Sequence, residues 1–359
     1  MQALRSIGPF SLDALVIGGL ALSAAAQTGS PDFQITPEER SAVIEQTIAE
    51  LNEIYIFPDV AKKMEDAVRA RSETHEYDSI TSAKAFAKKL TANLREVSHD
   101  KHLSVMFFQD GAREPSPGGP SVEEIAAQRP FMEKLNFGFE KVERMQGNIG
   151  YVDIRGFVPP AMGGETASAA MTFLANTDAL IVDLRKNGGG EPAMIAYVLS
   201  YLFDEPTHLN DIYERGGDKT QQWWTMPYVP GLRFGGKKPV YILTSSHTFS
   251  GGEEFAYNLK NLKRATLIGE KTGGGAHPSR PVKVSDHFMI ELPYARAINP
   301  ITHTNWEGTG VAPDIEKPAD QALDAAYWMA VEKTVETTSN PRQKEQLQKM
   351  LEERKRKNG

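Results

Sequence analysis

The residues best suited to chemistry in this chain lie around Ser250, in the stretch TSSHTFSGGEEFAYNLKNL at 244–262. An apolar strand pattern leads into the stretch and an amphipathic helix pattern follows it. Gly251 and Gly252 have no Cβ, so a ligand backbone can approach closely. The first free N–H groups of a helix and its dipole suit a developing negative charge. Ser250 could therefore be a nucleophile whose neighbour Gly251 contributes to an oxyanion hole, or an ordinary helix N-cap.

A second glycine-rich turn, DLRKNGGG at 183–190, also closes a predicted strand. Gly188, Gly189 and Gly190 would expose backbone N–H groups that no side chain obstructs, and Asn187, which precedes them, could support the site or contact substrate. Taken alone, three glycines are equally typical of a plain loop or of an anion-binding nest. The G-K-[ST] ending of a nucleotide-binding P-loop is missing.

A serine hydroxyl needs a base to become nucleophilic at neutral pH, and the chain contains eight histidines. His102 is the best candidate, because SHDKHLSVMF places it just before an apolar strand. His247, three residues before the candidate nucleophile, and His277, in GGGAHP, could support the site or contact substrate. A metal site of His99 and His102 with Asp100 is disfavoured, since no further ligand cluster accompanies these residues. We therefore predict no metal and no organic cofactor.

The base needs an acid to orient it. NWEGTGVAPD at 305–314 places Glu307 between Trp306 and Gly308. A carboxylate beside an indole ring would be partly desolvated, which suits a fixed hydrogen bond to an imidazole. The same pattern also fits an acidic residue in a surface turn.

Together these four stretches resemble the C-terminal processing (tail-specific) serine peptidases. The branch that they resemble most comprises the repeats of interphotoreceptor retinoid-binding protein and the tricorn core peptidase. The resemblance covers about 40–335, in the family's order. It implies a nucleophile, a base and an acid at Ser250, His102 and Glu307. It also implies oxyanion donors at the backbone of Gly251 and Gly189, with Gly188 as the neighbouring alternative.

Two departures from the family pattern refine this assignment. The residue before the base is serine in the tricorn-type tetrad but Lys101 here, so the resemblance supports a triad. Other members use a serine–lysine dyad, with the lysine in a T-F-G-K-G turn. That turn reads TGGGA at 272–276, so Gly275 holds the place of the lysine and Lys271 is out of register. A Ser–His–Glu triad is therefore preferred to a dyad.

The elements that must position these residues follow from the local patterns. Residues 36–97 read as three helices, at 36–55, 58–73 and 79–97, and the first opens with a Thr36-x-x-Glu39 capping box. From 137 onward strands alternate with helices, which predicts a largely parallel sheet. The resemblance implies an α/β, ClpP/crotonase-like core preceded by a small helical bundle.

The predicted organisation is a signal peptide, a helical subdomain, a linker, a peptidase core and a charged C-terminal helix or tail. Their ranges are 1–26, 27–108, 109–136, 137–335 and 336–359. The stretch between bundle and core is too short for a PDZ domain. Substrate tails would then be gripped elsewhere, for example by the 215–235 loop with Trp223 and Trp224.

Composition narrows the class of protein. The 359 residues carry a net charge of −7, which does not suggest a nucleic-acid or anionic-membrane partner. The absence of cysteine excludes disulfides and thiolate chemistry. An apolar run ending in Ala24-Ala25-Ala26 predicts cleavage before Gln27 and export to the periplasm or medium. We expect no membrane span in the mature chain, and an oligomer is compatible with the sequence.

The sequence-based hypothesis is a serine endopeptidase acting on polypeptides by acyl transfer. Two alternatives stay open. One is a non-catalytic binder of apolar ligands on the same fold, as the retinoid-binding relatives imply. The other is an esterase that uses the same triad on small substrates.

Overall fold

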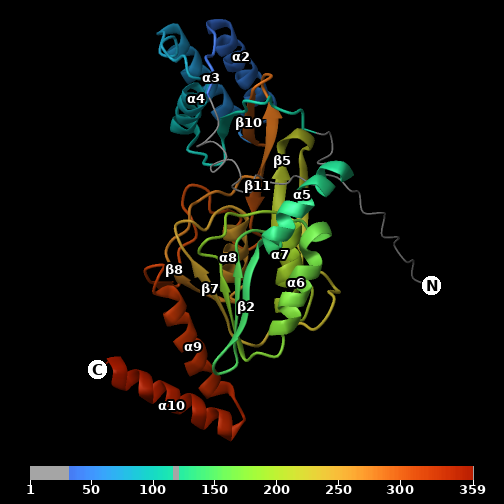
Figure 1. Ribbon diagram of the computed structural model, residues 1–359, viewed down its shortest axis with the longest axis vertical. Coiled ribbons are helices and arrows are strands. Elements are labelled where there is room, and N and C mark those ends of the chain that lie inside the picture. The colour runs from blue at the N-terminus through green and yellow to red at the C-terminus, as the bar shows by residue number, and fades with distance from the viewer. Residues whose placement is uncertain (1–31, 116–120, 359) are drawn as a thin grey trace, which may run out of the picture.

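The computed structural model describes residues 32–115 and 121–358, so the predicted signal peptide lies outside the described residues. Figure 1 shows a helical bundle at one end, an α/β core in the middle and a pair of C-terminal helices at the other end. The predicted α/β architecture with an N-terminal helical region is confirmed.

The bundle consists of α2 (Pro37–Ile54), α3 (Pro58–Glu73) and α4 (Ala83–Ser98). The predicted capping box of α2 is present: the Glu39 N–H donates to Thr36 Oγ1 at 3.2 Å, and the Thr36 N–H donates to Glu39 Oε2 at 2.8 Å. α4 begins later than the sequence pattern predicted, because Ser82 is its N-cap and accepts from the Ala85 N–H.

The bundle shares its hydrophobic core with strands that come from much later in the chain. β1 (Ser104–Phe107) pairs antiparallel with β10 (Phe288–Pro293), which pairs with β9 (Ser279–Lys283). Buried side chains of these strands, such as Ile290, pack in one cluster with Leu90 and Leu94 of α4. The connection between α4 and β1 is therefore fixed at both ends, and this connection carries His102.

The core is a six-stranded sheet in the order β12-β8-β7-β4-β3-β2, parallel except for the antiparallel pair of β2 and β3. Its strands are β2 (Phe139–Met145), β3 (Ile149–Ile154), β4 (Ala179–Asp183), β7 (Val240–Thr244), β8 (Thr266–Gly269) and β12 (Ile315–Glu316). The near-continuous apolar runs of the central strands reflect burial on both faces.

Alternate strand residues face opposite layers of helices. Leu180 and Val182 pack in the cluster that contains α6 (Pro160–Leu174), α7 (Pro192–Leu199) and α8 (Gly251–Asn261). Ile181 and Leu243 pack toward α9 (Ala322–Thr337), against which α10 (Pro341–Asn358) lies.

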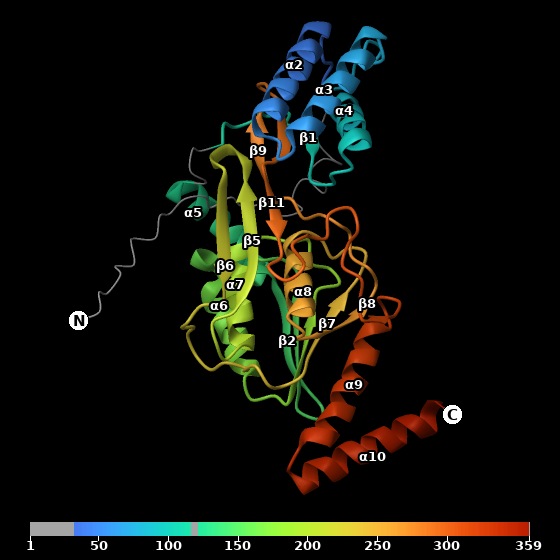
Figure 2. The ribbon, with the colours of Figure 1, turned by 180° about the vertical axis from the view of Figure 1, so that it is seen from behind.

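Three further strands run between the core and the bundle, as seen from behind in Figure 2: β5 (His208–Glu214), β6 (Lys219–Trp224) and β11 (Ala295–Ile298). The segment predicted as a linker contains α5 (Val122–Lys134), whose Met132 packs on Val158 and Met162. In the described parts of the chain, no helix combines the length and apolarity that crossing a membrane requires.

Candidate active site

Ser250 occupies the corner between β7 and α8 in a backbone conformation that non-glycine residues rarely adopt. Its φ is +52° and its ψ is −120°, and α8 begins at the next residue. A strained residue of this kind persists only where its surroundings hold it, and such residues concentrate at functional sites. The glycine turn after β4 lies against this corner, since a Cβ on Gly189 would stand 2.8 Å from the Ser250 Cβ. The two turns singled out in the sequence therefore meet.

The buried carboxylate of Glu253 fixes the Ser250 corner to the glycine run that starts at Gly273. Its Oε2 accepts from the Ser250 N–H and the Gly275 N–H, both at 2.9 Å, and its Oε1 accepts from the Gly274 N–H at 2.7 Å and from Thr272 Oγ1 at 2.5 Å. Burial raises the pKa of Glu253, and these donors oppose the rise. Sequence reasoning missed this residue, although its Ser-x-x-Glu spacing was a usable signal.

The predicted oxyanion donors differ in how their N–H groups are engaged. The Gly189 N–H donates to Asn187 Oδ1 at 2.8 Å, and the Gly188 N–H donates to the Arg155 carbonyl at 3.2 Å. Among the described residues, no acceptor is recorded for the Gly251 N–H or for that of Gly190. Gly251 is therefore the predicted donor with a free N–H, whereas Gly189 would have to exchange Asn187 for a reacting oxygen.

The His102 ring is buried next to the nucleophile's neighbour. It lies 4.8 Å from the Phe249 ring, centroid to centroid, and its side chain is 11% exposed. Neither ring nitrogen has a hydrogen-bond partner in the described structure. Burial lowers the pKa of His102 to about 4, which the charge of Asp100 only partly opposes. The imidazole is therefore neutral at pH 7 and free to accept a proton.

The glycine in the family's lysine position now has a physical explanation. A Cβ on Gly275 would lie 2.7 Å from His102 Cε1 and would also overlap the Phe249 ring. The Phe249 and His102 rings together thus occupy the space into which a side chain at position 275 would project. This arrangement favours a histidine base over a serine–lysine dyad.

We expect Gly275→Ala to displace the His102 and Phe249 rings and to lower the rate at which a fluorophosphonate modifies Ser250 by roughly 10²-fold, the cost of a misplacement of about 1 Å. Gly164→Ala is the matched control, because a Cβ there meets only Pro160 Cβ at 3.8 Å within a helix. Reaction rates with a fluorophosphonate measure both variants. Equal rates for G275A and the wild type would contradict the close packing of this base.

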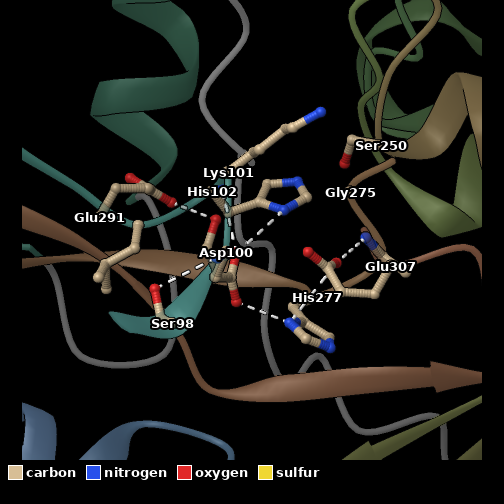
Figure 3. A network of polar contacts seen from close by, with 12 residues as sticks. Ser98, Asp100, Lys101, His102, Ser250, Gly275, His277, Glu291 and Glu307 are labelled. Carbon is tan, nitrogen blue, oxygen red and sulfur yellow. Dashed lines mark hydrogen bonds and ion pairs between the residues drawn. The ribbon is translucent and has the colours of Figure 1, made fainter. Parts of the chain in front are cut away.

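Asp100, His277 and Glu307 form a buried cluster beneath His102 (Figure 3). His277 Nδ1 lies 2.6 Å from Asp100 Oδ2 and 3.5 Å from Glu307 Oε2. Asp100 Oδ1 lies 3.9 Å from His102 Nδ1. Burial opposes ionisation of Asp100 and His277, but their mutual hydrogen bond and charges keep the pKa of Asp100 below, and that of His277 above, the ordinary value.

Glu307 is positioned by the loop predicted from its Trp and Gly neighbours. Trp306 is buried and its Nε1–H donates to the Gly275 carbonyl at 2.7 Å, while the Ala276 N–H donates to Glu307 Oε2 at 2.5 Å. Burial raises the pKa of Glu307 to about 7, and the charge of His277 opposes the rise. Glu307 Oε1 has no partner among the described residues.

The remaining sequence candidates lie away from this chemistry. His99 is exposed and ends α4 with a φ of +57°, and His247 is exposed. Lys101 Nζ donates to the Gly273 carbonyl. Trp223 is half-buried against the core, and Trp224 stacks on His208. The contribution of Asp100 to the cluster was missed, although its place two residues before His102 was visible in the sequence.

Comparison with known proteins identifies the family. Residues 148–317 match the model of "Peptidase family S41", and residues 36–136 match "N-terminal domain of Peptidase_S41 in eukaryotic IRBP". The chain belongs to peptidase family S41. The resemblance to C-terminal processing peptidases and tricorn protease predicted from the sequence is thereby confirmed.

Relatives and solved structures extend the comparison. The chain is similar to the tricorn protease of Thermoplasma volcanium, 29% identical over 48% of this chain and 15% of that protein. It is also similar to the carboxy-terminal processing protease CtpB of Bacillus subtilis, 24% identical over 55% of this chain and 42% of that protein. In both cases the match spans less than half of the relative's length.

Two solved structures share the fold over most of the chain. A putative peptidase from Parabacteroides merdae aligns with a TM-score of 0.59 at 18% identity, over 84% of this chain and 99% of that one. A lipoprotein from Streptococcus agalactiae aligns with a TM-score of 0.55 at 15% identity, over 83% of this chain and 98% of that one.

Proposed function

We propose that this protein is a serine-type endopeptidase that hydrolyses peptide bonds through Ser250, His102 and Glu307. The observation that carries the proposal is a buried, neutral imidazole with both ring nitrogens free, packed on the residue next to a strained serine at a helix N-terminus. Membership of a peptidase family and similarity to processing proteases support it.

In the proposed reaction, Ser250 Oγ attacks the peptide carbonyl and His102 takes the hydroxyl proton. The carbonyl oxygen becomes an oxyanion that the Gly251 N–H stabilises, with Gly189 as the second donor. His102 then gives the proton to the leaving amine, and water repeats the sequence on the acyl-enzyme. Among the described residues no ion pair joins Glu307 to His102, and Asp100 and His277 lie between them.

Labelling with a fluorophosphonate tests the proposal. Ser250 Oγ should form a bond to phosphorus as fluoride leaves, and peptide mass spectrometry should find the adduct on Ser250 alone. Cleavage of casein or of peptides with free C-terminal tails should accompany labelling. Absence of labelling in the folded protein would favour a binding protein, and turnover of p-nitrophenyl esters without peptide cleavage would favour an esterase.

We expect the labelling rate to rise with pH through about 7. Burial raises the pKa of Glu307 to about 7, so the ionised fraction of its carboxylate, which can stabilise an imidazolium at His102, increases as the pH rises through that value. Glu307→Gln should remove this rise and lower the rate at pH 8 by roughly 10²-fold, at the lower end of acid–base contributions. Rates measured from pH 5 to 9 decide the point; an unchanged profile in E307Q would contradict the role of Glu307.

We also propose that residues 1–26 direct export and are removed. The support is the apolar run and the small residues before Gln27. Protein recovered from exporting cells is expected to begin at Gln27 when its N-terminus is sequenced, and an N-terminus at Met1 would contradict this.

A further inference from the structure

We propose that Asp100 is the carboxylate that orients His102, and that Glu307 acts on the base only through His277 and Asp100. The groups that assist Ser250 would then form a series of four neighbouring side chains: His102, Asp100, His277 and Glu307. This inference rests on the proposed function and specifies how the charge of Glu307 reaches the base.

Distances among the four side chains define the order of the series. Asp100 Oδ1 lies 3.9 Å from His102 Nδ1, and Asp100 Oδ2 lies 2.6 Å from His277 Nδ1. The same His277 nitrogen lies 3.5 Å from Glu307 Oε2. In the part of the chain that the structure describes, no ion pair joins His102 to Glu307 directly. Figure 3 shows Asp100 between the two histidines and His277 beside Glu307.

Asp100 is held in place as a positioning residue must be. The His102 N–H donates to Asp100 Oδ1 at 3.0 Å, and Tyr55 OH donates to Asp100 Oδ2 at 3.2 Å. The side chain is 1% exposed. The carboxylate therefore cannot swing away from the ring, and the backbone bond places it two residues from the base on the same turn.

His277 is equally constrained. Its side chain is 6% exposed, and the Phe57 ring packs edge-on against it at 5.3 Å between centroids. Because one imidazole nitrogen is close to two carboxylates, protonation of His277 favours the ionised form of each of them. Without that cation, two buried like charges would repel each other and one would take up a proton.

Other charged groups of the described residues lie near these four side chains, and none of them lies between two consecutive members of the series. The positive charge of Arg95, on α4, attracts the carboxylate of Asp100 and opposes protonation of His102. Its guanidinium donates to the Leu103 and Lys101 carbonyls. The positive charge of Arg296, on β11, opposes protonation of His277, and the negative charge of Glu253, on α8, opposes ionisation of Glu307.

A double-mutant cycle on the fluorophosphonate labelling rate at pH 8 tests the inference. Asp100→Asn should lower the rate by about 10²–10⁴-fold, and more than E307Q does. In the H277Q background, E307Q should cost no more than about 3-fold further, because the path to the base is already broken. If E307Q costs the same factor in both backgrounds, Glu307 acts directly and the inference is overturned.

Controls separate this inference from the proposed function and from folding. His75→Asn and Asp78→Asn break a surface histidine–carboxylate pair of 2.8 Å and should leave the rate unchanged. Thermal unfolding of every variant checks the fold; should D100N not fold, the H277Q/E307Q cycle decides alone. Labelling that survives in S250A would instead refute the proposed function. A wild-type rate that falls on EDTA treatment would overturn the inference, because the cluster would then be a set of metal ligands.

Discussion

Ser250→Ala is expected to lower kcat for peptide cleavage by roughly 10⁴–10⁶-fold, the loss seen when a nucleophile that works as part of a unit is removed. The substitution deletes one oxygen from a half-buried position, so the fold should be preserved. Residual activity would come only from binding and the oxyanion donors. Initial rates on a quenched peptide substrate measure the effect.

Ser246→Ala provides the matched control, because this exposed serine lies in the same turn. Its activity should equal that of the wild type. Cleavage by S250A at more than about a hundredth of the wild-type rate would mean that the attacking group is elsewhere.

His102→Ala should produce a loss of the same order, because the hydroxyl of Ser250 is a weak nucleophile without a base. The double variant S250A/H102A should be no slower than either single variant, since residues of one catalytic unit are strongly non-additive. Rates of the three variants on the same substrate establish this. Additive losses would show that His102 and Ser250 act independently.

Rescue by added imidazole distinguishes a lost base from a damaged fold. The substitution leaves a space beside the Phe249 ring, where the His102 ring lies 4.8 Å away. Because His102 is neutral above about pH 4, the neutral form of added imidazole should restore part of the activity. A matched addition of imidazole to S250A should restore nothing. Failure to rescue H102A while its unfolding temperature has fallen sharply would point to packing as the role of the ring.

Much of the site was readable from local sequence, because backbone geometry is a local property. The capping box at Thr36 and Glu39 formed as predicted. The strand–turn–helix at Ser250 and the glycine turn at 188–190 also formed at the ends of parallel strands. Parallel strands bring their carboxyl ends to one edge, and these two turns are neighbours because β4 pairs directly with β7.

The cluster beneath the base was not readable from local sequence. Asp100 lies 177 residues before His277 in the sequence, and the contact between them depends on β1 pairing with β10 across a similar separation. Spacing in the sequence carries no signal for such pairing. It was therefore the tertiary structure that placed Asp100 between two imidazoles.

The sequence alone determined most of the elements, the family resemblance and the positions of the glycine turns and polar side chains, because these depend on residue type and neighbours. Only the tertiary structure decided which carboxylate faces His102, why position 275 must be glycine, and that Asn187 holds the Gly189 N–H. The physical reason is that burial and contact at a few ångströms set charge states and hydrogen bonds, and both arise from packing distant segments together.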